Sequence, residues 1–320
     1  MEKNKALSER VRSEISALQK YGVRWSVLSA WADELNRRRL MNPAWNGWSV
    51  AKAVEDMDRD GVERSLVSVT TPGVWFGDAA EARELARICN DYAARLRADH
   101  PTRFGIFAAL PLPDIDGTLA EIRYAFDELR VDGVGVLTSY GDKWFGDPSF
   151  APVMAELNRR RALIHVHPTV SDCCRNLIPS LHPMLIEYGA DTTRVIGQMV
   201  FGGEAQRHPD VRLIFSHGGG AMPFVYQRFI SHARHADAPR DALEWLPRFY
   251  YDTAAAAIAP PMAALRRVVP ISQIVFGTDY PYGTAGTVAR QLRDSGVFDA
   301  AEIAAIEHGN PAAVLAATKK

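Results

Sequence analysis

Four side chains that can bind a metal or move a proton stand at the ends of separate apolar runs in this sequence. His165 and His167 close one run, His217 follows a second and Asp279 follows a third. Imidazole nitrogens and carboxylate oxygens are common ligands of zinc and of related divalent metals. In a parallel (β/α) barrel, the groups that end the strands meet at one face, where the active site lies. The pattern therefore predicts a metal-dependent enzyme.

Each of these residues also has a purely structural interpretation. Residues two apart in a strand face the same side, so His165 and His167 could share a metal, but His165 equally fits a packed histidine. Pro168 ends the strand directly after His167, which favours a loop and a role in the site. The three glycines after His217 favour an acid, base or ligand over a turn cap. A buried carboxylate at Asp279 is costly unless a metal or hydrogen bonds compensate.

Other polar and aromatic residues follow the same apolar runs. Asp252 ends a further run, where its carboxylate could orient a ligand histidine. Trp75, Tyr140, Trp144 and Tyr280 are predicted to line the pocket and to contact an aromatic substrate. The alternative is ordinary packing, which is the more frequent role of aromatic side chains near loops.

The elements that position these residues alternate along the chain. Amphipathic helical patterns cover residues 79–98, 119–129 and 150–160. Apolar runs of strand length cover 62–69, 104–110, 133–137, 162–167, 211–216, 249–252 and 274–277. Such alternation predicts a parallel sheet covered by helices, as a (β/α)8 TIM-type barrel or, as the alternative, a doubly wound sheet. The doubly wound alternative normally has a glycine-rich phosphate loop after its first strand, and none is visible.

A closed barrel needs an eighth strand, which should precede residue 62. The segments 5–20 and 30–40 have helical patterns, and the short run 23–28 carries no metal-ligand residue at its end. The first histidine of the chain is His100. We therefore expect a barrel with an altered or missing first strand, in a domain spanning 48–320 after an N-terminal helical segment spanning 1–47.

Composition narrows the class of partner. The 320 residues are 47% hydrophobic, enough for one large core, and 37 basic residues nearly cancel 38 acidic ones. With a net charge of -1 we expect no nucleic-acid or membrane partner and favour a small molecule. The 3 cysteines form no evident disulfide framework, and the polar N-terminus does not resemble a signal peptide. These features predict a cytoplasmic protein.

Several motifs together resemble one known family. They are His167-Pro168-Thr169, the segment 215–220 with His217, the segment 277–281 with Asp279, and Gly309-Asn310-Pro311-Ala312. Their order and spacing resemble the amidohydrolase superfamily, in its branch of aminocarboxymuconate-semialdehyde decarboxylase-like enzymes. The segments 68–78, 103–117 and 169–174 look like its salicylate and resorcylate decarboxylase members. The resemblance extends from about residue 48 to the C-terminus.

The resemblance implies a (β/α)8 barrel that holds one divalent metal, zinc or manganese, and a homodimer or a dimer of dimers. By analogy, His167 and Asp279 are metal ligands, and His217 lies beside the metal, where it transfers a proton or polarises the substrate. The family's first strand carries a His-X-His or Glu-X-His motif that this sequence lacks. Either the chain begins after that strand or the ligand pair has been lost. Our hypothesis is that His165 and His217 complete a shifted site.

The activity implied is non-oxidative, metal-dependent decarboxylation of a small aromatic acid that resembles 2-hydroxybenzoate. Asp279 is the first choice for the proton carrier, and His217 would polarise the substrate. One alternative is hydrolysis, because the same metal environment can activate water against an amide, lactone or imine. Another is a barrel without activity that only binds a ligand or a partner subunit, because a metal site fails when its ligand count falls.

Overall fold

A seven-stranded parallel sheet forms the centre of the molecule. The computed structural model describes residues 48–175 and 177–317. The expected N-terminal helical segment 1–47 and the strand candidate 23–28 lie outside this part of the chain. The strands are β1 (Ser65–Val67), β2 (Phe104–Ala109), β3 (Gly133–Leu137), β6 (Leu163–His167), β7 (Arg212–Phe215), β8 (Tyr250–Asp252) and β9 (Ile274–Val275). All seven predicted apolar runs are thus confirmed as strands.

The strands follow their order in the sequence, β1-β2-β3-β6-β7-β8-β9, and each neighbouring pair is parallel. Because all run the same way, their carboxyl ends meet at one edge of the curled sheet. In β2 every residue is buried, and apolar residues that are covered on both faces are typical of a parallel sheet. Register places Leu137 beside His167 and Val166 beside Phe215, so the ends of β3, β6 and β7 are adjacent.

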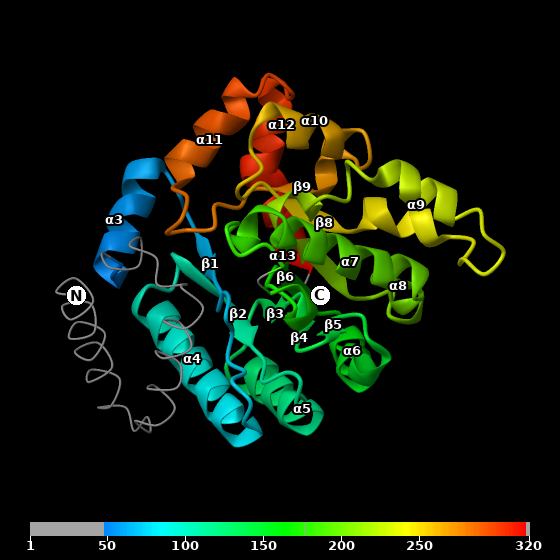
Figure 1. Cartoon of the computed structure of the whole chain (residues 1–320). Helices are drawn as coiled ribbons and strands as arrows, with labels where there is room; N and C mark the ends of the chain where they lie inside the picture. Colours follow the sequence, from blue (N-terminus) through cyan, green and yellow to red (C-terminus); the bar gives the residue numbers. More distant parts are fainter. Residues whose placement is uncertain (1–47, 176, 318–320) are drawn as a thin grey trace.

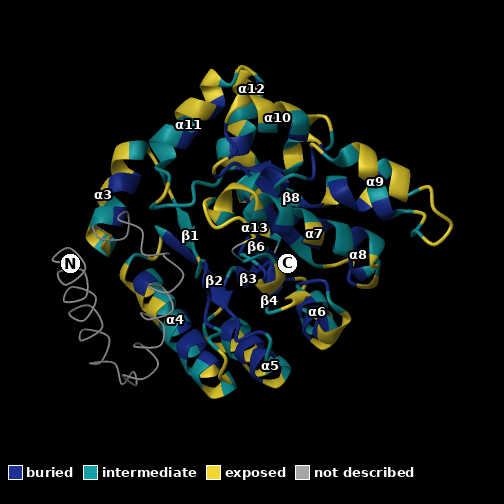
Figure 2. Cartoon of the chain, viewed as in Figure 1, coloured by how far each residue is buried: buried dark blue, intermediate teal, exposed yellow. Residues whose placement is uncertain are grey.

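Helices surround this sheet and present their exposed faces outward (Figures 1 and 2). They are α3 (Val50–Asp60), α4 (Ala79–Asp99), α5 (Ile115–Arg123), α6 (Ala151–Arg159), α7 (Glu187–Phe201), α8 (Glu204–Arg207), α9 (Tyr226–His232), α10 (Ala259–Arg266), α11 (Ala285–Asp294), α12 (Ala300–Ala304) and α13 (Asn310–Ala317). The predictions at 79–98 and 150–160 are confirmed. The third predicted helix begins earlier, at Ile115, and ends in a π-helical turn, Tyr124–Glu128. No helix in the described ranges is long and apolar enough to cross a membrane.

A small antiparallel hairpin, which the sequence analysis did not predict, follows β3. It consists of β4 (Ser139–Tyr140) and β5 (Lys143–Trp144), joined through Gly141 at a φ of 68°. The fully buried Asp191 on α7 accepts hydrogen bonds from Thr138 Oγ1 at 2.5 Å and from Trp144 Nε1 at 2.6 Å. A buried carboxylate is tolerated because these donors replace its water shell. The hairpin is thereby fixed to α7 at the carboxyl end of the sheet.

The long connection between β6 and α7 begins at the same end. It contains the short 3-10 turns Asp172–Cys174 and Pro183–Leu185. The sulfur atoms of Cys173 and Cys174 lie 2.50 Å apart there, a proximity that their spacing did not lead us to expect.

Candidate metal centre

Three side chains with metal-binding groups come together at the carboxyl end of the sheet. His167 ends β6, His217 lies in the turn after β7, and Asp279 follows β9. One ligand atom from each residue lies within 4.8 Å of the others. His167 Nε2 is 3.6 Å from Asp279 Oδ1, and the two imidazole centroids are 5.4 Å apart. Residues separated by 112 positions in the sequence thus form one site, because parallel strands end together.

Hydrogen bonds to backbone carbonyls determine which nitrogen of each ring is free. His167 Nδ1 lies 2.9 Å from the carbonyl oxygen of Pro168, and His217 Nδ1 lies 3.0 Å from that of Ala254. Because a carbonyl oxygen only accepts, each Nδ1 must carry the proton, which leaves the electron pair on Nε2. This arrangement is typical of metal-binding histidines, whose second nitrogen is fixed by an outer partner. Two such nitrogens and a carboxylate oxygen therefore fit a divalent metal.

The backbone at two of these residues is in a left-handed conformation. His217 has a φ of 58° and Asp279 a φ of 56°. Such a conformation costs a residue other than glycine about 1 kcal/mol or more and persists where surrounding contacts impose it. Asp252 Oδ1 accepts the backbone N–H of His217 at 2.9 Å, and the carbonyl of Asp279 accepts that of Tyr282 at 2.8 Å. These contacts hold both side chains at the site.

The glycines after His217 are required by both backbone conformation and space. Gly218, Gly219 and Gly220 have φ values of 64°, 78° and 64°. A β-carbon at Gly219 would lie 2.8 Å from the ring of Tyr251. The run therefore allows the turn that carries His217 to approach β8 closely.

The environment of Asp279 favours its ionised form. Burial raises the pKa of this carboxyl, but its interactions with His167, whose Nε2 lies 3.6 Å from Oδ1, and with His217 and His165 outweigh burial and hold the pKa below its ordinary value. A carboxylate that stays ionised is suited to binding a metal. A proton donor must instead hold its proton near neutral pH, which an ionised carboxylate does not.

His165 occupies a different place from the three gathered side chains. Its Nε2 lies 3.1 Å from Ser216 Oγ and 3.4 Å from Asp252 Oδ2, and its ring stacks on Phe107 at 5.4 Å. Asp252 in turn holds the backbone of His217. Among the described atoms, the buried Nδ1 of His165 has no hydrogen-bond partner. The contacts therefore give His165 a supporting position behind the site, through Asp252.

The position of His165 leads to a first prediction. The His165→Phe variant should keep its bound metal, because in the unmodified protein Nε2 of His165 contacts Ser216 and Asp252 and is not free to bind a metal. Activity should fall moderately, because Asp252 loses a partner while it holds His217. Elemental analysis of the purified variant beside His167→Phe checks this expectation. Loss of metal from both variants would instead establish His165 as a ligand.

The predicted substrate-binding aromatics are spread over several environments. Tyr140 is buried in the core against Phe150, and its hydroxyl accepts the backbone N–H of Leu137. Trp144 donates to Asp191, and Tyr280 donates its hydroxyl to Asp56 Oδ2 at 2.9 Å. Trp75 is half-buried in the segment before α4. The structure therefore gives Tyr140, Trp144 and Tyr280 a hydrogen-bond partner each, and the substrate role of all four side chains stays a prediction.

Two residues that the sequence analysis did not select lie beside His167. Thr70 Oγ1 is 3.4 Å from His167 Nε2, and the ring of Tyr188 is 6.4 Å from that of His167. Thr70 directly follows a predicted strand, so the rule that selected His167 and Asp279 could have found it. Tyr188 lies on α7 after a long connection, and no local pattern indicates its position.

Comparison with known proteins identifies the class. A family model described as Amidohydrolase matches residues 23–316. The 6-methylsalicylic acid decarboxylase acuB of Aspergillus aculeatus is 34% identical over 265 residues, which cover 78% of this chain and 80% of the relative. The 2-amino-3-carboxymuconate-6-semialdehyde decarboxylase of Dictyostelium discoideum is 29% identical over 263 residues, which cover 78% of this chain and 71% of the relative. The chain belongs to the amidohydrolase family, as its motifs suggested.

Solved structures confirm the fold. A structure of an amidohydrolase II superposes with a TM-score of 0.83 at 23% identity, covering 90% of this chain and 96% of that one. A dihydroxybenzoic acid decarboxylase from Polaromonas sp. JS666, described with bound manganese and the inhibitor 2-nitroresorcinol, gives a TM-score of 0.73 at 23% identity, covering 83% and 85%. The fold is therefore the TIM-type barrel of this superfamily, with seven of its strands in the described part of the chain.

Proposed function

We propose that this chain is a metal-dependent, non-oxidative decarboxylase of a small aromatic acid of the 2-hydroxybenzoate type. The observation that carries the proposal is the convergence of His167, His217 and Asp279 at the carboxyl end of the sheet. The relative with 34% identity is named for the same chemistry on 6-methylsalicylic acid. Bound zinc or manganese would supply a positive charge that orients and polarises the phenolate and carboxylate oxygens of the substrate. The manganese described in the Polaromonas structure supports a divalent metal of this kind.

In the proposed reaction, two residues hold the metal and a third transfers the proton. His167 and Asp279 hold the metal. His217, in its imidazolium form with a proton on each nitrogen, delivers the Nε2 proton to the ring carbon that bears the carboxylate. The bond between that carbon and the carboxylate then breaks, its electrons restore the aromatic ring, and carbon dioxide leaves. His217 recovers a proton from solvent. The carbonyl of Ala254, which fixes Nδ1 at 3.0 Å, keeps Nε2 as the exchanging nitrogen.

Substrate contacts in this proposal come from residues near the ligands. Thr70 and Tyr188, which lie beside His167, would contact the acid or its hydroxyl. Trp75 remains a candidate for stacking on the ring, since the structure gives it no competing polar partner among the contacts of the described residues. The homodimer and the cytoplasmic location stay predictions.

A substrate panel tests the proposal. The protein is loaded with manganese or with zinc, then supplied with 2-hydroxybenzoate, 6-methylsalicylate and 2,6-dihydroxybenzoate, and release of carbon dioxide is measured. We expect release from at least one acid, dependent on the metal. A parallel panel of amides and lactones separates the hydrolase alternative, because hydrolysis gives amine or ring-opened acid without carbon dioxide. Turnover in that panel alone would overturn the decarboxylase proposal.

A further inference from the structure

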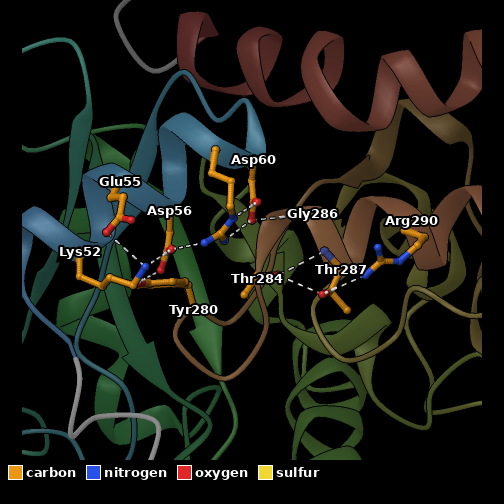
Figure 3. A network of polar contacts seen from close by, with 10 residues as sticks. Lys52, Glu55, Asp56, Asp60, Tyr280, Thr284, Gly286, Thr287 and Arg290 are labelled. Atoms are coloured by element: carbon orange, nitrogen blue, oxygen red, sulfur yellow. Dashed lines mark hydrogen bonds and ion pairs between the residues drawn. The ribbon is translucent and has the colours of Figure 1, made fainter.

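Two carboxylates on α3 contact the segment that follows Asp279. Asp56 Oδ2 accepts the hydroxyl of Tyr280 at 2.9 Å, and Asp60 Oδ2 accepts the backbone N–H of Gly286 at 2.9 Å (Figure 3). Asp56 and Asp60 are four residues apart, so they lie on one face of α3. Helix α3 therefore holds both the loop after β9 and the beginning of α11.

Asp56 is built to receive the Tyr280 hydroxyl. Its carboxylate is buried, with 9% of the residue exposed. Lys52 Nζ donates to Oδ1 at 2.7 Å, and Arg59 Nη1 donates to the same oxygen. The hydrogen bond from Lys52 holds the pKa of Asp56 below its ordinary value. With Oδ1 occupied by two cations, Oδ2 remains as a strong, charged acceptor for the phenol.

Tyr280 connects this carboxylate directly to the site, because it is the residue after Asp279. The turn between them is tight: Asp279 is left-handed, and its carbonyl accepts the N–H of Tyr282 at 2.8 Å. The N–H of Tyr280 donates to Thr278 Oγ1 at 3.2 Å. Few free torsions therefore separate the phenol from the Asp279 side chain. Fixing the Tyr280 hydroxyl therefore restricts the position of the Asp279 carboxylate.

We propose that Asp56, acting through the Tyr280 hydroxyl, positions Asp279 for metal binding. Asp56 is a positioning residue that touches neither metal nor substrate. The inference rests on the metal role of Asp279 in the proposed function. It also gives Tyr280 an anchoring role in place of the substrate contact expected from the sequence.

The test uses the full chain with two conservative variants and a matched control. Tyr280→Phe removes only the hydroxyl, and Asp56→Asn keeps the size of the side chain. Glu55→Gln is the control, because Glu55 also contacts Lys52, at 3.3 Å, but is exposed on the same helix. Affinity for Mn²⁺ is measured by competition with a chelator. Amide hydrogen exchange of the segment 279–284 is measured without metal.

We expect the Mn²⁺ dissociation constant to rise about 10-fold in Tyr280→Phe and in Asp56→Asn, as is typical when an outer partner of a ligand is removed. The double variant should bind Mn²⁺ no more weakly than either single variant, because both substitutions break the same hydrogen bond between Tyr280 and Asp56. Exchange in 279–284 should become faster in these variants and stay unchanged in the control.

A purely structural role would lower the melting temperature of the variants and leave the affinity of the folded protein unchanged. Equal affinity in the variants and the original protein therefore overturns the inference. Unchanged exchange in 279–284 also overturns it, and this readout needs no metal. Absence of Mn²⁺ and Zn²⁺ binding by the original protein would instead count against the proposed function, so the two failures are distinguishable.

Discussion

Replacing Asp279 by asparagine is expected to remove the bound metal and to reduce decarboxylation by roughly a thousandfold or more, since a catalytic metal supplies several kcal/mol of charge stabilisation. The substitution replaces an ionised ligand by a neutral amide of the same size. His167 and Asp279 are the two ligands of the proposed site, and replacing the charged one leaves His167 alone, so the site should lose its metal. Elemental analysis and carbon dioxide release from the same preparation measure both effects.

Asparagine is the sharper substitution because of the backbone at Asp279. Its φ of 56° is tolerated by asparagine but disfavoured for alanine, so Asp279→Ala mixes ligand loss with backbone strain. Asp237→Asn, at an exposed acidic residue, is a suitable control for the loss of one charge. A variant at Asp279 that is folded and retains one equivalent of metal with full activity would contradict the role of this residue as a ligand.

Lowering the pH should weaken metal binding, as Asp279→Asn does. Metal binding requires the carboxylate form, and protons compete for it. Because the pKa of Asp279 lies below its ordinary value, the carboxylate stays ionised into more acidic solution than an unperturbed aspartate. Its contribution to metal binding is therefore present at neutral pH and is lost only as the pH falls through that lowered pKa.

The outline of the site was predictable because parallel strands end at a common edge. Apolar runs marked β6, β7 and β9, and the first metal-type residue after each run pointed to His167, His217 and Asp279. Periodicity indicates that a residue ends a strand, but it does not determine the rotation of a side chain beyond that end. Tyr140 follows β3 in the same way, yet its ring packs in the core against Phe150.

Other features depended on contacts that no local pattern records. The bond between Tyr280 and Asp56 joins residues 224 positions apart, and α3 shows only an ordinary amphipathic pattern in the sequence. The hairpin β4–β5 has strands of two residues, too short for alternation to be recognised, and it depends on Asp191 from a distant helix. The left-handed backbone at His217 is likewise imposed by Asp252 and by packing. Tertiary contacts thus decide how the predicted residues are held.

Replacing His217 can show whether this residue is a metal ligand or the proton donor. We expect His217→Asn to retain its metal through His167 and Asp279 while its turnover number falls about 100- to 10,000-fold, the usual contribution of a general acid or base. Asparagine tolerates the left-handed φ of 58° and can still donate to the carbonyl of Ala254, so the turn is preserved. Metal content and turnover are measured on the same preparation.

The surface variant His235→Asn controls for loss of a histidine elsewhere. Because an amide does not act as a general acid or base near neutral pH, lost turnover with retained metal would assign proton transfer to His217. Loss of metal from His217→Asn would assign this residue to the ligand set, since its ligand atom lies within 4.8 Å of those of His167 and Asp279. Proton transfer would then require another group, and Asp279 could not supply it while its carboxylate stays ionised on the metal.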